Sequence, residues 1–375
     1  MKEKPPLKIF YLISSRGWGG MEMHPFAVAR GLIQRGHSVA FGLSAGSRMS
    51  RYAQASGFPH LALPFRWYFD PSTFAKIRQY LRDRQVDVLH VHYSRDTWHA
   101  LVLVGLFRRK IPFVYTRHMG SPTKWPKTDP LHRLLTRRLD AMVAISDYVR
   151  KNCFRLYRIS EGKVRLLYYG LGSEVAGQPE KGREVREKLG VQPEELLVGM
   201  VAQISRDKRQ DLLLQAAGRV LAEFPETKFV LAGAPTNKEY EDKLRATAEQ
   251  SGLAGRVLFT GFWEDIPSLM QALDIAVLTS KSEAFGLVVI EAMANGRAFV
   301  GSRSGAIPEV VEHGRNGLLF EPGDPEDLAR NLLELLRDPA KRLHMGKEAR
   351  EVFEERFTLG REVQETEDLY RSLIR

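Results

Sequence analysis

The stretch that decides the fold is SEAFGLVVIEAMANG, residues 282–296. It follows a short apolar segment, residues 274–279, and a helix is expected to begin near Phe285 and Gly286 and to end before Gly296. A strand, a polar loop and a helix in this order form half of a βαβ unit. The stretch therefore predicts a parallel sheet covered by helices.

The same alternation runs along all 375 residues. The predicted strands are residues 8–14, 38–44, 86–91, 112–117 and 140–146 in the first half, and 196–203, 228–233, 256–260, 274–279, 297–301 and 317–320 in the second. The rhythm breaks in a polar stretch rich in glycine, residues 168–190. We expect two doubly wound domains, residues 1–170 and 171–358, with a last helix at about 359–375 that packs back on the first domain.

Composition indicates a globular protein with 43% hydrophobic and 27% charged residues. No apolar run approaches the roughly 20 residues that cross a bilayer, and the first residues lack a signal-peptide core, so a cytoplasmic location is expected. Residues 1–170 carry 29 Lys and Arg against 10 Asp and Glu, a net charge of +19, whereas the remainder carries −8. The basic half favours an anionic partner, such as a membrane, an acidic substrate or a nucleic acid.

Glu283 and Glu291 flank the start of the predicted helix. Its first N–H groups, at Phe285, Gly286 and Leu287, are expected to face an anion at the carboxyl edge of the sheet. A carboxylate accepts two hydrogen bonds, which suits the vicinal hydroxyls of a sugar or a ribose. An anion site with a diol-binding acid on either side predicts a nucleotide sugar.

A second loop of interest is RGWGGME, residues 16–22, between the first strand and a helix. A dinucleotide fingerprint would need glycine at position 22, where the chain has Glu22, and the spacing of a P-loop is absent. NAD binding is therefore disfavoured. What remains is a turn whose glycines, Gly19 and Gly20, let an anionic ligand approach the backbone.

Together these motifs resemble the "glycosyl transferases group 1" family of retaining nucleotide-sugar transferases. Glu283 and Glu291 are similar to its E-x7-E motif, and GGME to its G-G-x-E loop. Further similar stretches are DVLHVHY at 87–93, LLYYGLG at 166–172, where Tyr169 replaces the family's Asn, and GAIPEVVEHGRNGLLFEPGDPEDLA at 305–329. The resemblance covers nearly the whole chain and implies the α/β fold called GT-B, two Rossmann-like domains facing a central cleft.

The resemblance also implies roles for single residues. It assigns Lys208 to the diphosphate, Glu283 to the donor sugar, Glu291 to the ribose diol, His118 to the donor sugar near the reacting centre, and Gly19 and Gly20 to the diphosphate. The family commonly shows G-R-L-x-x-x-K, but this chain has Ala202-Gln203-Ile204, so Arg206 is expected to take over the diphosphate contact. His92 and Arg117 are acceptor-side candidates.

By analogy with the family, the protein is expected to move a hexose-type sugar, with retention, from a nucleotide diphosphate sugar to a cell-envelope acceptor such as a lipopolysaccharide core or a glycolipid. UDP is the expected nucleotide. No metal or other cofactor is expected, because Lys208, Arg206 and helix N–H groups would support the leaving diphosphate. The first domain would hold the anionic or lipid-linked acceptor at the cytoplasmic face of the inner membrane.

Two basic stretches favour a peripheral contact with an anionic membrane. Residues 98–110 end in three cations, and residues 131–139 place Leu131, Leu134, Leu135 and Leu139 on one face beside three arginines. Packing of these apolar faces on the sheet is the alternative for each helix.

Other functions stay open or are disfavoured. A nucleotide-sugar 2-epimerase or hydrolase on the same fold, and a transferase with a soluble acceptor, remain alternatives. Nucleic-acid binding is disfavoured because residues 67–69 are the only nearby aromatic cluster and the acidic pair would be unexplained. A metal site is disfavoured because no local spacing provides a third ligand among the histidines at 90, 92, 99, 118 and 132.

Overall fold

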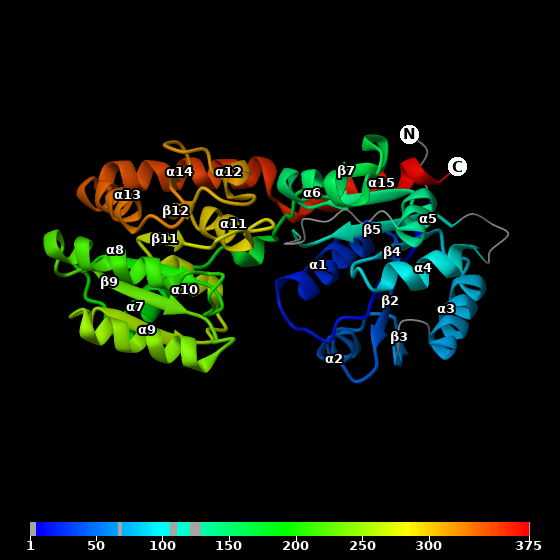
Figure 1. The fold of residues 1–375 in the computed structure, drawn as a ribbon, viewed down its shortest axis with the longest axis horizontal. Helices are drawn as coiled ribbons and strands as arrows, with labels where there is room; N and C mark the ends of the chain where they lie inside the picture. The colour runs from blue at the N-terminus through cyan, green and yellow to red at the C-terminus, as the bar shows by residue number, and fades with distance from the viewer. Residues whose placement is uncertain (1–4, 67–69, 106–110, 121–128, 375) are drawn as a thin grey trace. The chain divides into compact units, whose positions relative to one another are not determined.

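A computed structural model describes residues 5–66, 70–105, 111–120 and 129–374. The chain divides into two compact units (Figure 1). The first unit comprises Met1–Gly170 and Leu359–Arg375, and the second comprises Leu171–Thr358. These boundaries coincide with those expected from the sequence, including the return of the last helix to the first unit. The assignment of acceptor and donor to the two units stays a prediction.

The first unit is a seven-stranded parallel sheet in the order β3-β2-β1-β4-β5-β6-β7. Its strands are β1 (Lys8–Ile13), β2 (Ser38–Ser44), β3 (His60–Leu63), β4 (Val88–Val91), β5 (Phe113–Arg117), β6 (Ala141–Ala144) and β7 (Val164–Leu166). Its helices are α1 (Gly20–Gln34), α2 (Arg48–Ala55), α3 (Pro71–Asp83), α4 (Asp96–Gly105), α5 (Pro130–Arg138), α6 (Asp147–Tyr157) and α15 (Leu359–Leu373). The two strands that the sequence analysis misses, β3 and β7, are the edge strands. They are short and partly exposed, so they lack the fully apolar pattern of buried strands.

The second unit is a six-stranded parallel sheet in the order β10-β9-β8-β11-β12-β13. Its strands are β8 (Leu197–Val201), β9 (Lys228–Ala232), β10 (Val257–Gly261), β11 (Ile275–Leu278), β12 (Ala298–Ser302) and β13 (Leu318–Phe320), and all six are predicted from the sequence. Its α-helices are α7 (Pro179–Lys188), α8 (Gln210–Glu223), α9 (Lys238–Gln250), α10 (Ile266–Ala272), α11 (Leu287–Ala294), α12 (Ile307–Val310), α13 (Pro325–Arg337) and α14 (Pro339–Arg356). The polar stretch at 168–190 thus contains a helix, α7, after the boundary.

An aspartate just before a strand sets the register in both sheets. Asp87, Asp140 and Asp274 each precede a central strand, and each accepts a hydrogen bond at 2.8–3.0 Å from the N–H at the start of the neighbouring strand. The backbone N–H of each aspartate donates back to the carbonyl of the same neighbour at 2.7–2.9 Å. These reciprocal pairs satisfy backbone groups at the amino edge of each sheet.

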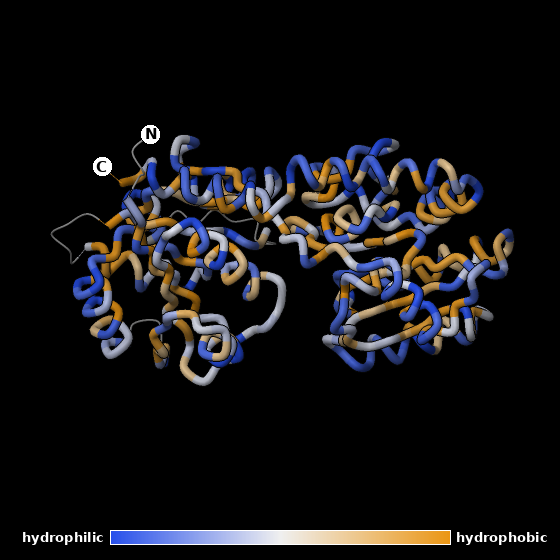
Figure 2. Tube along the Cα trace, turned by 180° about the vertical axis from the view of Figure 1, so that it is seen from behind, coloured by the Kyte–Doolittle hydropathy of each residue, from blue (hydrophilic) through white to orange (hydrophobic). Residues whose placement is uncertain are grey.

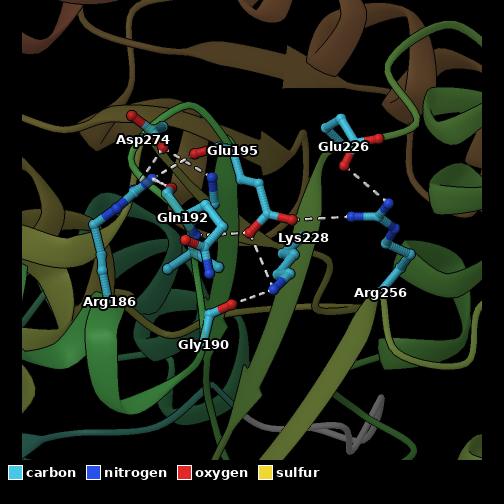
Figure 3. A network of polar contacts seen from close by, with 9 residues as sticks. Arg186, Gly190, Gln192, Glu195, Glu226, Lys228, Arg256 and Asp274 are labelled. Carbon is cyan, nitrogen blue, oxygen red and sulfur yellow. Dashed lines mark hydrogen bonds and ion pairs between the residues drawn. The ribbon is translucent and has the colours of Figure 1, made fainter.

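Charged side chains at the amino edge of the second sheet bind one another (Figure 3). Glu195 lies 3.0 Å from both Lys228 and Arg256, and Arg186 lies 3.0 Å from Asp274. Because these charges are paired among themselves, the amino edge serves to hold α7, β8, β9 and β10 together.

The last helix completes the core of the first unit. Val363, Leu369 and Tyr370 of α15 are buried in the same cluster as Tyr11 and Phe26. A Cβ at Gly31 of α1 would lie 2.5 Å from Val363, so glycine lets the two helices approach closely. The hydrophobic colour in Figure 2 follows the strands of both units. None of the helices in the described ranges combines the length and the apolar character that crossing a membrane requires.

Candidate active site

The strand order of each unit reverses at one point, between β1 and β4 in the first and between β8 and β11 in the second. Ligands of doubly wound sheets bind at the carboxyl ends of the strands at such a point. The predicted residues Lys208 and Glu283 follow β8 and β11, and Gly19 follows β1. Each unit therefore presents its candidate residues at its own switch point.

In the second unit, the loops after β8 and β11 are tied together by hydrogen bonds. The hydroxyl of Thr279 donates to the carbonyls of Lys208 and Arg209, at 2.7 and 2.8 Å. The N–H of Lys281 donates to the carbonyl of Asp207 at 2.9 Å. The two loops thus form one surface, with Lys208 held beside the acidic loop.

Lys208 and Glu283 form an ion pair, with 2.5 Å between Nζ and Oε1. Their side chains are 28% and 13% exposed, so both groups can be reached by a ligand. The backbone of Glu283 is fixed from the other side, because its carbonyl accepts the N–H of Ala306 at 2.9 Å. A Cβ at Gly305, whose φ is +58°, would lie 2.3 Å from that carbonyl oxygen. Only glycine fits there without moving Glu283.

Glu291 lies on α11 and is partly buried. Burial raises the pKa of its carboxyl to about 7. Among the residues that the structure describes, no group donates a hydrogen bond to this carboxylate. An isolated acid of this kind is destabilised in its charged form and gains most from a ligand that donates O–H groups.

The predicted anion-binding turn lies at the start of α11. Gly286 adopts φ +90° and immediately precedes the first helical residue, Leu287. Phe285 is buried with its ring 6.0 Å from that of Phe357, which anchors the turn. Whether the N–H groups of Phe285, Gly286 and Leu287 bind an anion stays a prediction.

Arg206 is exposed and lies over the ring of Tyr240, with 5.7 Å between the guanidinium carbon and the ring centroid. Gln203 is also exposed. The structure thus places Arg206 against α9, whereas Lys208 contacts Glu283. The assignment of Arg206 to the diphosphate remains a prediction.

The glycine-rich loop of the first unit contacts the carboxylate of Glu22. Ser15 Oγ donates to Glu22 Oε1 at 2.8 Å, and a Cβ at Gly17 would lie 2.7 Å from the same oxygen. A side chain at Gly17 would therefore crowd the Glu22 carboxylate. Gly19 and Gly20 are exposed, so their backbone is accessible, as the predicted diphosphate contact needs.

The candidate histidines of the first unit are buried in a hydrogen-bonded cluster. His118 Nδ1 bonds to the hydroxyl of Tyr169, and His118 Nε2 lies 3.1 Å from His92 Nδ1. His92 stacks on His90, with ring centroids 4.2 Å apart. Burial lowers the pKa of His92 and of His118 well below the usual value, so both rings are neutral at pH 7.

Arg117 is buried beside this cluster, with its guanidinium donating to the hydroxyl of Tyr157 at 2.9 Å. Its place in the interior of the first unit is thereby explained by packing. The acceptor roles of His92 and Arg117 stay predictions. Within the described residues, no group of three or more His, Cys, Asp or Glu side chains is arranged to hold a metal ion.

No sequence pattern indicates the partners of these histidines. In the sequence, Tyr169 stands out only as a departure from the family's Asn, and neither His24 nor Glu362 stands out. His24 and Glu362 lie 2.8 Å apart and are separated by 338 residues. No local pattern signals such a pair, because it depends on the return of α15 to the first unit.

Comparison with known proteins agrees with this architecture. A family model described as "Glycosyl transferases group 1" matches residues 182–352, and one described as "Glycosyltransferase Family 4" matches residues 18–174. The lipopolysaccharide core biosynthesis mannosyltransferase LpcC of Rhizobium leguminosarum bv. viciae is 30% identical over 295 residues, which cover 75% of this chain and 79% of LpcC. The chain belongs to the glycosyl transferases group 1 family. Its members transfer sugars, and this chain is a glycosyltransferase.

Other proteins match at similar levels. The N-acetyl-alpha-D-glucosaminyl L-malate synthase of Bacillus anthracis is 27% identical over 316 residues, which cover 82% of this chain and 80% of that enzyme. The crystal structure of Anabaena HepE in complex with UDP has a TM-score of 0.87 and 25% identity, covering 98% of this chain and 100% of HepE. The two Rossmann-like domains are thus those of a GT-B glycosyltransferase.

Proposed function

We propose that the protein transfers a hexose-type sugar, with retention of configuration, from a UDP-sugar to a cell-envelope acceptor such as a lipopolysaccharide core or a glycolipid. One observation carries the proposal: beside a helix start, Lys208 is paired with Glu283, and nearby on α11 the carboxylate of Glu291 has no hydrogen-bond donor among the described residues. A relative bound to UDP and another named as a lipopolysaccharide core mannosyltransferase support the donor and the acceptor class.

In this proposal, the ion pair opens when the donor binds. Lys208 moves to the diphosphate, where it stabilises the negative charge that develops as the sugar leaves. Glu283 is thereby released to accept hydrogen bonds from the sugar hydroxyls, and Glu291 accepts those of the ribose. The acceptor attacks from the face that the diphosphate leaves, and no metal is needed because cationic side chains support the leaving group.

The remaining predicted residues have supporting roles in the proposal. Arg206 contributes a second positive charge to the diphosphate, and the backbone of Gly19 and Gly20 approaches the same group. His118 contacts the donor sugar near the reacting centre. His92 and Arg117 belong to the acceptor side.

The donor is tested by thermal unfolding in the presence of UDP-, GDP- and ADP-sugars. A ligand at 100 times its dissociation constant adds about 2.7 kcal/mol of stability, which gives a clear shift of Tm. We expect UDP-sugars to give the largest shift, and a larger shift with a GDP-sugar would contradict the assignment of UDP. Incubation with the donor alone is the control, since an epimerase or hydrolase would consume the donor without an acceptor.

A peripheral contact with an anionic membrane is part of the proposal. Leu134 of α5 is 43% exposed, and the side chains of Arg133, Arg137 and Arg158 line a pocket of about 480 Å³. No partner for these three guanidinium groups occurs among the described residues.

The prediction that the leucines of residues 131–139 share one apolar face is corrected, because Leu135 and Leu139 are buried whereas Leu134 is exposed. The side chain of Leu131 and residues 67–69 and 106–110 lie outside the description.

Sedimentation with liposomes tests this contact. We expect binding to vesicles with anionic lipid and little binding to neutral vesicles, with a loss of binding at high salt. The double variant R133A/R137A should weaken binding, whereas R183A/R219A, which removes two exposed arginines of the second unit, should not. Equal binding to neutral and anionic vesicles would contradict the electrostatic contact.

A further inference from the structure

The ring of His118 is held at both nitrogens. Its Nδ1 bonds to the Tyr169 hydroxyl, and its Nε2 bonds to His92 Nδ1. The second nitrogen of His92, Nε2, is buried and has no hydrogen-bond partner among the described residues. His92 lines a cavity of about 30 Å³ together with His24, His90 and Tyr169, among others. The chain of hydrogen bonds therefore runs from Tyr169 through His118 to His92 and ends at a space large enough for one water molecule.

Tyr169 is itself held by the last helix. Glu362 of α15 accepts the N–H of Gly170 at 2.7 Å and lies 2.8 Å from His24 Nε2. The ring of His24 packs on that of Tyr169, with centroids 4.1 Å apart. Tyr169 is thus fixed both through its neighbour in the chain and through its ring.

The protonation of the chain follows from the same geometry. A neutral imidazole carries one N–H, so its two nitrogens have different roles. Burial raises the pKa of Tyr169 well above its usual value, so its hydroxyl keeps its proton. If that hydroxyl donates to His118 Nδ1, the His118 proton must sit on Nε2, where it donates to His92. In this arrangement, one hydroxyl sets the tautomer of two histidines.

We propose that Tyr169 is a positioning residue for His118: its hydroxyl fixes the orientation and the tautomer of the His118 ring, and Glu362 and His24 hold Tyr169 in place. The inference rests on the proposed function, in which His118 contacts the donor sugar. It adds a role for a residue at which the chain departs from its family's pattern. It also makes α15 part of the support of the site.

The variant Y169F tests the proposal, because it removes one hydroxyl and keeps the ring. We expect the turnover number to fall about 10- to 100-fold while the KM of the donor changes less than about 2-fold, since a misplaced contact costs rate more than binding. In ¹⁵N NMR spectra, His118 should be the Nε2–H tautomer in the parent protein and a mixture of tautomers in Y169F. The matched control is Y370F, which removes a buried hydroxyl that bonds to His90 and not to His118.

Three results would overturn the proposal: unchanged turnover in Y169F, an unchanged tautomer of His118, or an equal loss of turnover in Y370F. The NMR measurement needs no activity and therefore decides even for a weakly active variant. The variant H118A separates this inference from the proposed function. If H118A keeps its turnover, the role of His118 is wrong; if only H118A loses turnover, the role of Tyr169 is wrong.

Discussion

The two units have the same type of sheet but opposite chemistry at their carboxyl edges. In the first unit, the edge is closed by neutral, buried histidines and tyrosines. In the second, it carries the partly exposed ion pair of Lys208 and Glu283. The comparison teaches that the topology determines where a ligand can bind, whereas the few residues after each strand determine which ligand it is. The charged and accessible edge offers a cation to a ligand, whereas the buried edge holds its neutral side chains in fixed orientations.

The largest expected effect is on the charged edge. K208A should lower the turnover number about 100-fold or more, because it removes the cation that supports the leaving group. K281A is the matched control, since Lys281 lies in the same pair of loops and its side chain is exposed. Steady-state kinetics with a UDP-sugar measures both variants. Retention of full turnover in K208A would show that the charge at this edge serves only to hold Glu283.

The next prediction concerns pH and distinguishes the two edges. In the first unit, burial lowers the pKa of His90 to about 3 and that of His92 and His118 well below the usual value. Below pH 6.5 these histidines bind protons in the unfolded chain but stay neutral in the folded unit. They therefore lower the free energy of unfolding as the pH is lowered. Burial raises the pKa of Asp96 to about 7, which acts in the opposite direction over this range. Burial also lowers the pKa of His99, so the buried histidines outnumber Asp96 and the net effect is a loss of stability of the first unit as the pH falls below 6.5.

In the second unit, the raised pKa of Glu291 means that its carboxyl is protonated in the folded state below about pH 7. This group alone makes that unit more stable as the pH falls from 7 to 4.5, by roughly 1 kcal/mol per pH unit. Hydrogen exchange of α1 and α15 against α11 and α13, at pH 7.5 and 5.5, compares the units in one sample. Equal changes of protection in both would contradict the contrast.

A smaller effect, on the stability of the second unit, is expected from a substitution at Gly305, which lies against the backbone of Glu283. G305A places a Cβ 2.3 Å from the Glu283 carbonyl at a positive φ, so we expect a loss of about 2 kcal/mol or more in the free energy of unfolding of the second unit. Denaturant unfolding measures it. G218A is the control, because Gly218 lies in the middle of α8 on its exposed face, with no atom within 4 Å of an added Cβ. This variant should raise the free energy of unfolding by about 1 kcal/mol.

The smallest effect is on donor binding. If only the ionised form of Glu291 accepts the ribose hydroxyls, the dissociation constant for UDP should rise up to about 10-fold for each pH unit below 7. E291Q should bind UDP more weakly and with a flatter pH dependence. Calorimetric titrations at pH 6, 7 and 8 measure this. An unchanged pH profile in E291Q would assign the titration to another group.

Much of the fold is predictable because buried parallel strands are continuous apolar runs. All strands at the centre of both sheets are predicted, whereas β3 and β7 are missed because edge strands are short and half exposed. The resemblance assigns Lys208 and Glu283 to the same donor, but it does not predict the ion pair between them, which the structure shows after strands on either side of one switch point.

The sequence does not predict which candidates are buried. Arg117 and His92 read as polar groups at strand ends, but the structure places both in the interior. Their burial depends on Tyr157, His118 and Tyr169, which come from other elements of the first unit. Long-range contacts of this kind leave no periodic pattern in the chain.

The position of α15 has a consequence for synthesis on the ribosome. Tyr370, which is fully buried in the first unit, is translated after the whole of the second unit. The first unit therefore cannot complete its core until the second unit has been made, although its strands are made first. The second unit, whose residues are contiguous, can fold before the core of the first unit is complete.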